Sequence, residues 1–349
     1  YPVSDAAQRL HASLLIGDWH TDSLLWDRDL LKRGTRGHVD FPRLNEGNVG
    51  LQMLTAVTKS PKGHNYDRNA ADASDNITPL VMAQRWPMAT WTSLLARALH
   101  QASRLRGYEK RAPATLTLVR TQSDLANVLK RRAAGDKVIG VLLGIEGGHP
   151  LEGKIGNVDV LYEAGYRLIG LTHFFDNELG GSLHGESNAG LTDFGREVVA
   201  AAMQRGIILD LAHASPQVAE DVLALDKRPL VVSHTGVRGH CDHKRNFPDA
   251  LMKKIASQGG VIAIGYWKTV VCDPSPKGVV AAIAAAVKLV GEEHVSLGSD
   301  YDGSVTVAFD TAELAALTHE MLAAGFSETR IRKIAGGNMA RVLEQVLPK

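Results

Sequence analysis

The sequence predicts a single-domain (β/α)8 TIM-type barrel over residues 1–349, and three observations predict it. Short apolar segments rich in β-formers alternate with longer helical patterns along about 300 residues. Several of the short segments are nearly continuous hydrophobic runs, such as VIGVLLG and GIILDLA, which is typical of parallel strands buried on both faces. No GxGxxG follows a strand and no Walker loop occurs, so a nucleotide-binding sheet loses its usual support.

Eight strands are expected in chain order: Leu14–Asp18, Val49–Val57, Val138–Gly144, Arg167–Thr172, Ile207–Leu211, Leu230–Ser233, Gly260–Tyr266 and Val295–Gly298. Helical patterns cover Ala89–Leu105, Val158–Ala164, Asp193–Arg205, Pro216–Ala224, Pro248–Gln258, Val279–Val290 and Thr311–Ala324. Ser215 before Pro216, and Ser327 before Glu328, are typical helix starts. The polar segment 60–88 is expected to be a long excursion from the second strand, and residues 327–347 to form one or two packed helices.

Composition excludes several classes of function. Hydrophobic residues make up 44% and charged residues 22% of the chain, and the formal net charge is +1. This balance indicates a globular protein with a sizeable core and no dedicated nucleic-acid surface. No apolar run reaches the roughly 18–20 residues that a transmembrane helix needs. Only two cysteines are present, so a cysteine-rich zinc site is excluded.

The chemistry is predicted where the strands end. Six strands are followed closely by a residue that can bind a metal or carry a proton; these residues are His20 with Asp22, Glu146, His173, His213, His234 and Asp300. The carboxyl ends of the strands of a (β/α)8 barrel converge on one mouth, where catalytic residues lie. Chance explains one such histidine easily, but not six coincidences at one location.

The pattern predicts a two-metal centre. His20 and Asp22 are one residue apart, so both side chains point the same way from an extended segment. Glu146 can bridge two ions, and His213 and His234 supply nitrogen ligands to the second. This mixed ligation suits two Zn²⁺ ions, with Mn²⁺ or Co²⁺ as chemical alternatives. We expect a metal-bridging hydroxide as nucleophile.

Asp300 is placed to take a proton from the water and pass it to a leaving amine. Asp302 is expected to shape its loop by hydrogen bonding, and Asp210 to support the site from behind the ligands. His149 is expected to be structural. His240, Cys241 and His243 resemble a metal cluster superficially, but no second cysteine lies nearby.

The chain resembles the membrane (renal-type) dipeptidases, zinc peptidases with a barrel related to the amidohydrolases. The motifs that carry the resemblance run from about residue 16 to 303: GDWHTD, GIEGGHPL, LTHFFDN, LDLAHAS, VVSHTG, KRNFPD and LGSDYDG. The resemblance implies that His173 contacts the substrate near the scissile carbonyl. It also implies that Arg245 receives the C-terminal carboxylate, a role that suits a guanidinium fork. The implied substrates are dipeptides with a free C-terminus, L,D-dipeptides included, and a homodimer is implied as well.

The resemblance also bears on the two cysteines, which sequence alone favours as unpaired core residues. Cys241 and Cys272 match positions that form an intrachain disulfide in mammalian relatives. Together with a first residue, Tyr1, that is not Met, this favours export to the periplasm or the cell exterior, with no signal visible in the sequence. A cytoplasmic location is the alternative.

Two departures limit what the resemblance implies. Many amidohydrolase barrels carry HxH on the first strand and a carboxylated lysine as the bridge, whereas this chain has HxD and a glutamate. After LTH the chain reads FFDNELGGSLHG instead of a tryptophan-bearing loop, so side-chain preference does not transfer. The competing functions are hydrolysis of a β-lactam or another cyclic amide by the same metals, and a binding protein that has lost catalysis.

Overall fold

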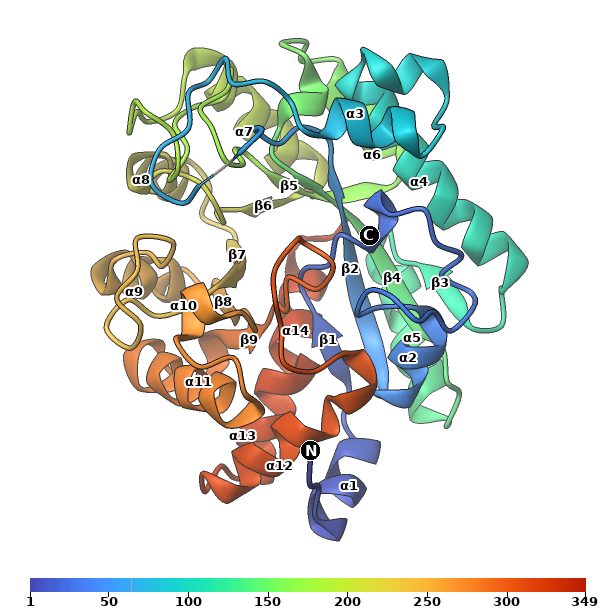
Figure 1. Cartoon of the computed structure of the whole chain (residues 1–349). Helices are drawn as coiled ribbons and strands as arrows, with labels where there is room; N and C mark the ends of the chain where they lie inside the picture. Colours follow the sequence, from blue (N-terminus) through green and yellow to red (C-terminus); the bar gives the residue numbers. More distant parts are fainter. Residues whose placement is uncertain (64) are drawn as a thin grey trace.

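The computed structural model describes residues 1–63 and 65–349; His64, in the expected excursion after the second strand, lies outside them. Parallel strands surround the centre of the molecule and helices cover them from outside (Figure 1). The strands are β1 (Ile16–Asp18), β2 (Val49–Val57), β3 (Leu116–Leu118), β4 (Ile139–Glu146), β5 (Tyr166–Gly170), β6 (Ile208–Asp210), β7 (Val231–Thr235), β8 (Val261–Ile264) and β9 (Val295–Leu297). Their order is β1-β2-β4-β5-β6-β7-β8-β9, and every printed pairing is parallel.

The first and last strands approach each other and nearly close the barrel. The Trp19 amide donates to the Leu297 carbonyl at 3.0 Å, and the Asp22 amide donates to the Tyr301 carbonyl at 3.0 Å. The predicted (β/α)8 barrel is therefore confirmed, with eight strands in the wall. β3 is an additional short strand that pairs only with the beginning of β4.

The α-helices follow the strands around the outside: α1 (Asp5–Ala12), α2 (Phe41–Glu46), α3 (Ile77–Ala83), α4 (Leu94–Arg111), α5 (Gln122–Ala133), α6 (Asn157–Ala164), α7 (Asp193–Arg205), α8 (Pro216–Leu225), α9 (Asp249–Ser257), α10 (Lys268–Val271), α11 (Pro276–Val290), α12 (Ala315–Ala323), α13 (Glu328–Arg332) and α14 (Asn338–Val346). Ser215 and Ser327 cap α8 and α13 as expected. Among the described residues, no helix has both the length and the apolar composition needed to cross a membrane.

Two local predictions need correction, and several short or polar elements were missed. The helix expected from Ala89 begins at Leu94, because the Ser93 hydroxyl accepts the Ala96 amide and fixes the start there. The helix expected from Thr311 begins as a short 3₁₀ turn, and its α-helical part starts at Ala315. α1, α2, α10, β3 and α5 were not predicted: the first four are at most eight residues long, and α5 has a mostly polar sequence.

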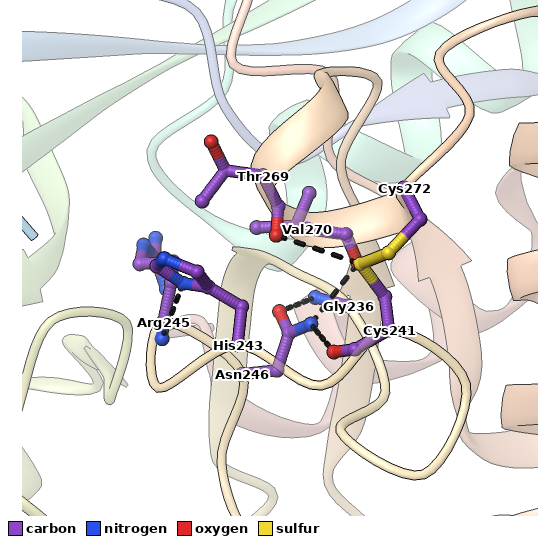
Figure 2. Close-up of a disulfide and its surroundings, with 8 residues drawn as sticks. All are labelled: Gly236, Cys241, His243, Arg245, Asn246, Thr269, Val270 and Cys272. Atoms are coloured by element: carbon purple, nitrogen blue, oxygen red, sulfur yellow. Dashed lines mark hydrogen bonds between the residues drawn. A yellow bond between two sulfur atoms is a disulfide. The ribbon is translucent and has the colours of Figure 1, made fainter.

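A disulfide ties together two loops at the mouth of the barrel. Cys241, after β7, is bonded to Cys272, which directly follows α10 (Figure 2). Beside it, the Asn246 side chain accepts from the Gly236 amide at 2.8 Å and donates to the carbonyls of Cys241 and Val270, both at 3.0 Å. The loop that carries Arg245 is therefore held by covalent and hydrogen bonds, and the pairing implied by the resemblance is present.

Candidate active site

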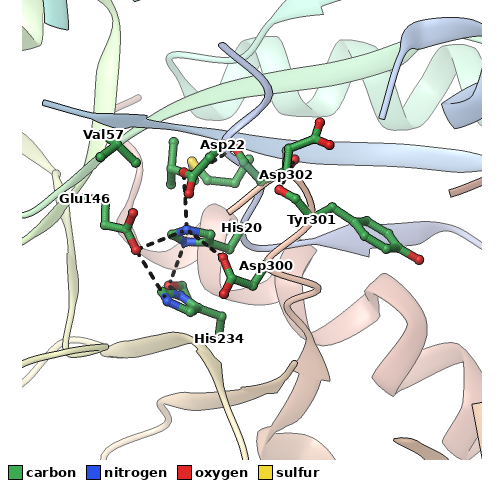
Figure 3. A network of polar contacts seen from close by, with 12 residues as sticks. His20, Asp22, Val57, Glu146, His234, Asp300, Tyr301 and Asp302 are labelled. Atoms are coloured by element: carbon green, nitrogen blue, oxygen red, sulfur yellow. Dashed lines mark hydrogen bonds and ion pairs between the residues drawn. The ribbon is translucent and has the colours of Figure 1, made fainter. Parts of the chain in front are cut away.

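The strand-end residues predicted from the sequence converge on one buried cluster at the barrel mouth. Glu146 is the last residue of β4, and the pairing of Val57 with Glu146 places it beside the end of β2. His20 lies two residues beyond β1, and His234 lies within β7. In Figure 3, Glu146, His20 and His234 point toward one another from these separate strands.

The Glu146 carboxylate is the centre of the cluster. Its Oε1 atom lies 3.4 Å from His20 Nε2, 3.2 Å from His213 Nε2 and 3.4 Å from His234 Nε2. Its Oε2 atom lies 3.4 Å from His173 Nε2. Four histidines from different strands therefore face one carboxylate, all of them buried.

The five predicted ligands divide into two overlapping groups. His20, Asp22 and Glu146 form one, and Glu146, His213 and His234 form the other, each with ligand atoms within 4.8 Å of one another. His20 Nε2 lies 3.5 Å from Asp22 Oδ1 and has no hydrogen-bond partner among the described residues. The shared member is Glu146, as expected for a bridging ligand.

Neighbouring polar groups fix the orientation of the ligands. The Thr55 hydroxyl donates to Asp22 Oδ1 at 2.6 Å. The Ser233 hydroxyl donates to Asp210 Oδ2 at 2.5 Å, so it can accept from His234 Nδ1 at 2.8 Å and from His20 Nδ1 at 3.3 Å. This arrangement turns the Nε2 atoms of both histidines toward Glu146.

Asp210 thus supports the site from behind the ligands, as predicted, but Ser233 was missed. An equivalent arrangement joins β1 to the segment that follows β9. Asp18 accepts from the Ser299 hydroxyl at 2.6 Å and from the His20 amide at 3.1 Å. The signal for Ser233 in the sequence is its position directly before a strand-end histidine, and the signal for Asp18 is its position two residues before another.

The electrostatics of the cluster favour uncharged His213 and His234 beside an ionised Glu146. Burial acts against a charged His20, but Glu146 and Asp22 raise the pKa of His20 well above its usual range. Burial, together with the charge of Arg245, holds the pKa of His213 well below its usual range, and burial and nearby cations do the same to His234. Burial acts against ionisation of Glu146, but His173 and His20 keep its pKa well below the ordinary value. The Nε2 atoms of His213 and His234 lie only 2.9 Å apart, so two ring nitrogens face one small volume.

Asp300 lies at the edge of the cluster, with Oδ1 3.9 Å from His20 Nε2. Burial raises the pKa of Asp300 well above its usual range, and the charges of Asp22 and Glu146 reinforce this, although His20 opposes it. Asp300 has a φ of 59° and His213 a φ of 65°. Left-handed backbone at non-glycine residues costs energy and tends to occur at functional sites.

Asp302 shapes the loop beside Asp300, as predicted. Its carboxylate accepts from the Ser23 hydroxyl at 2.6 Å and from the His38 amide at 2.7 Å, and it forms an ion pair with Arg28. Burial acts to raise the pKa of Asp302, but hydrogen bonding to His38, the charge of Arg28 and the Ser23 bond lower it to about 2. Asp302 is therefore a structural carboxylate rather than a second base.

Arg245 is buried beside the second ligand group, only 1% exposed. It donates to the His234 carbonyl at 2.7 Å and lies 3.4 Å from His213 Nε2. Its guanidinium lies 5.7 Å from the centre of the Trp267 ring. Among the described residues no carboxylate forms an ion pair with it, so one cation at the cavity wall is left without a counter-charge.

His149 and His243 lie outside the two ligand groups. His149 packs edge-on against Phe175 with ring centres 5.0 Å apart, and burial lowers its pKa to about 3. His243 Nδ1 accepts the Arg245 amide at 3.1 Å. Because Cys241 is in the disulfide, the GHCDH segment cannot supply a thiolate ligand.

The fold and the site define a class: a metal-dependent hydrolase built on a TIM-type barrel. The family is then given by the sequence, because residues 4–347 match the membrane dipeptidase family, peptidase family M19. The chain belongs to this family, and with it to the metal-dependent peptide-bond hydrolases. This confirms the resemblance stated above and the dipeptidase activity it implies.

Individual relatives agree with this assignment. The dipeptidase verJ of Clonostachys rogersoniana is 30% identical over 318 residues, which cover 88% of this chain and 76% of the relative. The dipeptidase aclJ of Aspergillus oryzae (strain ATCC 42149 / RIB 40) is 27% identical, covering 94% and 77%. The crystal structure of the probable dipeptidase PvdM from Pseudomonas aeruginosa superposes with a TM-score of 0.81 at 21% identity, covering 98% of each chain.

A structure of a metallo peptidase from Rhodobacter sphaeroides, liganded with a phosphinate mimic of the dipeptide L-Ala-D-Ala, superposes with a TM-score of 0.76 at 21% identity, covering 95% of this chain and 99% of that one. At these identities the structural matches support the fold. Export and the homodimer stay predictions.

Proposed function

We propose that this chain hydrolyses dipeptides with a free C-terminal carboxylate, using two Zn²⁺ ions. His20 and Asp22 would hold one ion, His213 and His234 the other, and Glu146 both. The observation that carries the proposal is the contact of three histidine Nε2 atoms with one Glu146 oxygen at 3.2–3.4 Å. Neutral imidazoles and carboxylates in a closed cluster are a donor set that Zn²⁺ prefers.

The buried polar atoms fit bound cations. Because the Ser233 hydroxyl donates to Asp210, His234 can donate a hydrogen bond from Nδ1–H to the Ser233 oxygen, which leaves a lone pair on Nε2. That lone pair faces His213 Nε2 at 2.9 Å, while His20 Nε2 has no hydrogen-bond partner among the described residues. Buried polar groups without partners are costly, and a cation between these atoms would remove that cost.

Bound divalent ions would supply Lewis acidity, which polarises a carbonyl oxygen and lowers the pKa of water. The chain's own groups would do the rest. Asp300 would accept a proton on its carboxylate and return it to the leaving amine, a role that suits a buried carboxyl with a raised pKa. His173 is held by a hydrogen bond between Nδ1 and the Lys59 carbonyl at 3.2 Å, and its Nε2 faces the cavity near Glu146.

Arg245 would bind the substrate carboxylate. Its planar fork can pair with both carboxylate oxygens, and burial makes such a pair strong. Because the guanidinium lies against His213 and His234, a carboxylate bound there would place the peptide carbonyl that precedes the C-terminal residue over the ligand cluster.

The test compares dipeptides with free and amidated C-termini in the zinc-loaded enzyme. The panel includes L-Ala-L-Ala and L-Ala-D-Ala, since the Rhodobacter sphaeroides structure holds a mimic of the latter. Amidation should lower kcat/KM by about 100-fold or more, the scale of a lost charged hydrogen-bonded pair. Replacing Arg245→Met should lower kcat/KM for the free acid to a similar extent and remove the discrimination.

Lys244→Met is the matched control, because Lys244 is the neighbouring cation and its side chain is 35% exposed. It should keep the discrimination of the wild type. Equal rates for free and amidated substrates in the wild type would show that Arg245 does not bind the carboxylate. Rapid hydrolysis of a cyclic amide with no hydrolysis of any dipeptide would favour the alternative hydrolase instead.

A further inference from the structure

A second, larger cavity adjoins the cavity that contains the ligand cluster. The catalytic cavity has a volume of about 110 Å³ and is lined by Asp22, Glu146, His213, Arg245 and Asp300, among others. The neighbouring side compartment has a volume of about 530 Å³. Five residues line both: Trp26, Leu80, Asp302, Ser304 and Val305. The two cavities are therefore adjacent, with these five residues on the boundary between them.

The shared walls present mainly apolar surface and are firmly held. The Trp26 indole nitrogen donates to the Asp302 carbonyl at 2.7 Å, so its polar atom is satisfied and the ring is left to line the cavity. Trp26 and Leu80 both pack against a small hydrophobic cluster that includes Val81 and Trp86. Arg28 and Asp302, which both line the side compartment, form an ion pair with each other, whereas Asp27 and Arg36, which also line it, are exposed to solvent. An apolar ligand would therefore meet a preformed surface whose buried charges are paired.

The side compartment and Arg245 lie beside different parts of the ligand cluster. Arg245 contacts His213 and His234. Trp26 instead contacts the loop of Asp302, two residues from Asp300. In Figure 3, Glu146 and His234 lie to one side of His20, and Asp302 lies to the other. A dipeptide with its carboxylate at Arg245 and its carbonyl over Glu146 would thus extend its first residue toward Asp22, Asp300 and the side compartment.

We propose that the side compartment binds the side chain of the substrate's N-terminal residue and selects large apolar, above all aromatic, side chains. The proposal rests on the proposed function, because Arg245 sets the direction of the substrate. The carboxylates of Asp22 and Asp300 would face the free α-ammonium group, and the apolar walls formed by Trp26, Leu80 and Val305 would cover the side chain. The side chain of the C-terminal residue would not reach this compartment, so it would gain no binding energy there.

The experiment measures kcat/KM of the zinc-loaded enzyme for Phe-Ala, Ala-Phe and Ala-Ala. Phe-Ala should exceed Ala-Ala by about tenfold or more, since burying a few carbon atoms in a hydrophobic pocket discriminates on that scale. Ala-Phe should gain no comparable advantage. Similar values for Phe-Ala and Ala-Ala, or a preference for Ala-Phe over Phe-Ala, would overturn the inference and leave the proposed function standing.

A variant fills the compartment from its far side. Gln84 lines the side compartment but not the catalytic cavity, and both polar atoms of its side chain lack hydrogen-bond partners among the described residues. Gln84→Trp therefore breaks no side-chain bond of those residues, and it should lower the ratio of Phe-Ala to Ala-Ala by about tenfold. Met82→Trp is the control, because Met82 lies in α3, two residues before Gln84, but is 45% exposed; it should keep the wild-type ratio.

The measurements distinguish a failure of this inference from a failure of the proposed function. An unchanged ratio in Gln84→Trp, with zinc content and Tm like the wild type, would show that the compartment does not hold the side chain. If the zinc-loaded wild type hydrolysed none of the three dipeptides, the proposed function would fail and this inference with it.

Discussion

Removing the Ser233 hydroxyl tests the hydrogen bonds that orient the ligands. That oxygen donates to Asp210 Oδ2 at 2.5 Å and lies 2.8 Å from His234 Nδ1 and 3.3 Å from His20 Nδ1. The Ser233 hydroxyl therefore connects the buried Asp210 with His20 of one ligand group and with His234 of the other. In Ser233→Ala, both imidazoles lose the acceptor that fixes their tautomer, and Asp210 Oδ2 loses its donor.

The expected effect follows from the number of bonds lost. Removing a hydrogen-bond partner of a metal-binding histidine typically weakens metal affinity by about 10–100-fold, equivalent to about 1.4–2.8 kcal/mol. Leaving buried polar atoms unpaired lowers the free energy of unfolding of the metal-free protein by about 1–3 kcal/mol for each group. The effect on affinity should be larger at the His234 group, because its contact is shorter.

The assay is a competition between the protein and a chelator of known zinc affinity, with urea unfolding of the metal-free protein in parallel. Ser296→Ala is the matched control: Ser296 is also a buried strand serine, but its hydroxyl has no hydrogen-bond partner among the described residues. It should change zinc affinity by less than about twofold. The reasoning is refuted if Ser233→Ala binds zinc as tightly as Ser296→Ala.

Three further predictions follow from the site and its surroundings. Asp300→Asn should retain bound metal by elemental analysis but lose about 10²–10⁴-fold in kcat, the usual contribution of a general acid–base; normal turnover would show that the base is misassigned. Replacing Cys241 and Cys272 together by Ser opens a loop with a sequence separation of 31 and should lower the free energy of unfolding by about 3 kcal/mol. In that variant KM should rise more than kcat falls, because the loop carries Arg245, and a loss of kcat alone would contradict this. Asp302→Asn should lower the free energy of unfolding by about 2 kcal/mol at neutral pH. The folded-state pKa of Asp302 is lowered from 3.8 to about 2, so its contribution is complete above about pH 4 and disappears as the pH falls toward 2; a difference between variant and wild type in urea unfolding that stays constant from pH 7 to pH 3 would exclude this role.

The barrel and the ligand cluster were predictable because both depend on local patterns. Each wall strand is a short apolar run, and His213 and Asp300 each follow such a run closely. α5 was missed although Thr121 and Asp124 form a capping box at its start, because the helix is mostly polar and β3 before it has only three residues. The capping signal is present in the sequence, but the helix that follows it has too weak a hydrophobic pattern to be recognised.

The supporting contacts of the site could not be predicted from local patterns. Ser233 and His20 are 213 residues apart in the sequence, and Thr55 is 33 residues from Asp22. Such pairs meet only because the barrel brings the strand ends together. The burial of Arg245 is of the same kind: its neighbours in the sequence are charged and polar, and only packing against Trp267 and His234 shows that it is not a surface cation.

The central claim is that five residues hold two zinc ions and that these make the chain a dipeptidase. The most direct measurement titrates metal-free protein with Zn²⁺ while following both bound metal and hydrolysis of L-Ala-L-Ala. We predict two equivalents of zinc per chain, with activity complete at the second, and loss of bound zinc and of activity together in Glu146→Gln. Full activity in the metal-free protein, or saturation at one equivalent with full activity, would contradict the account.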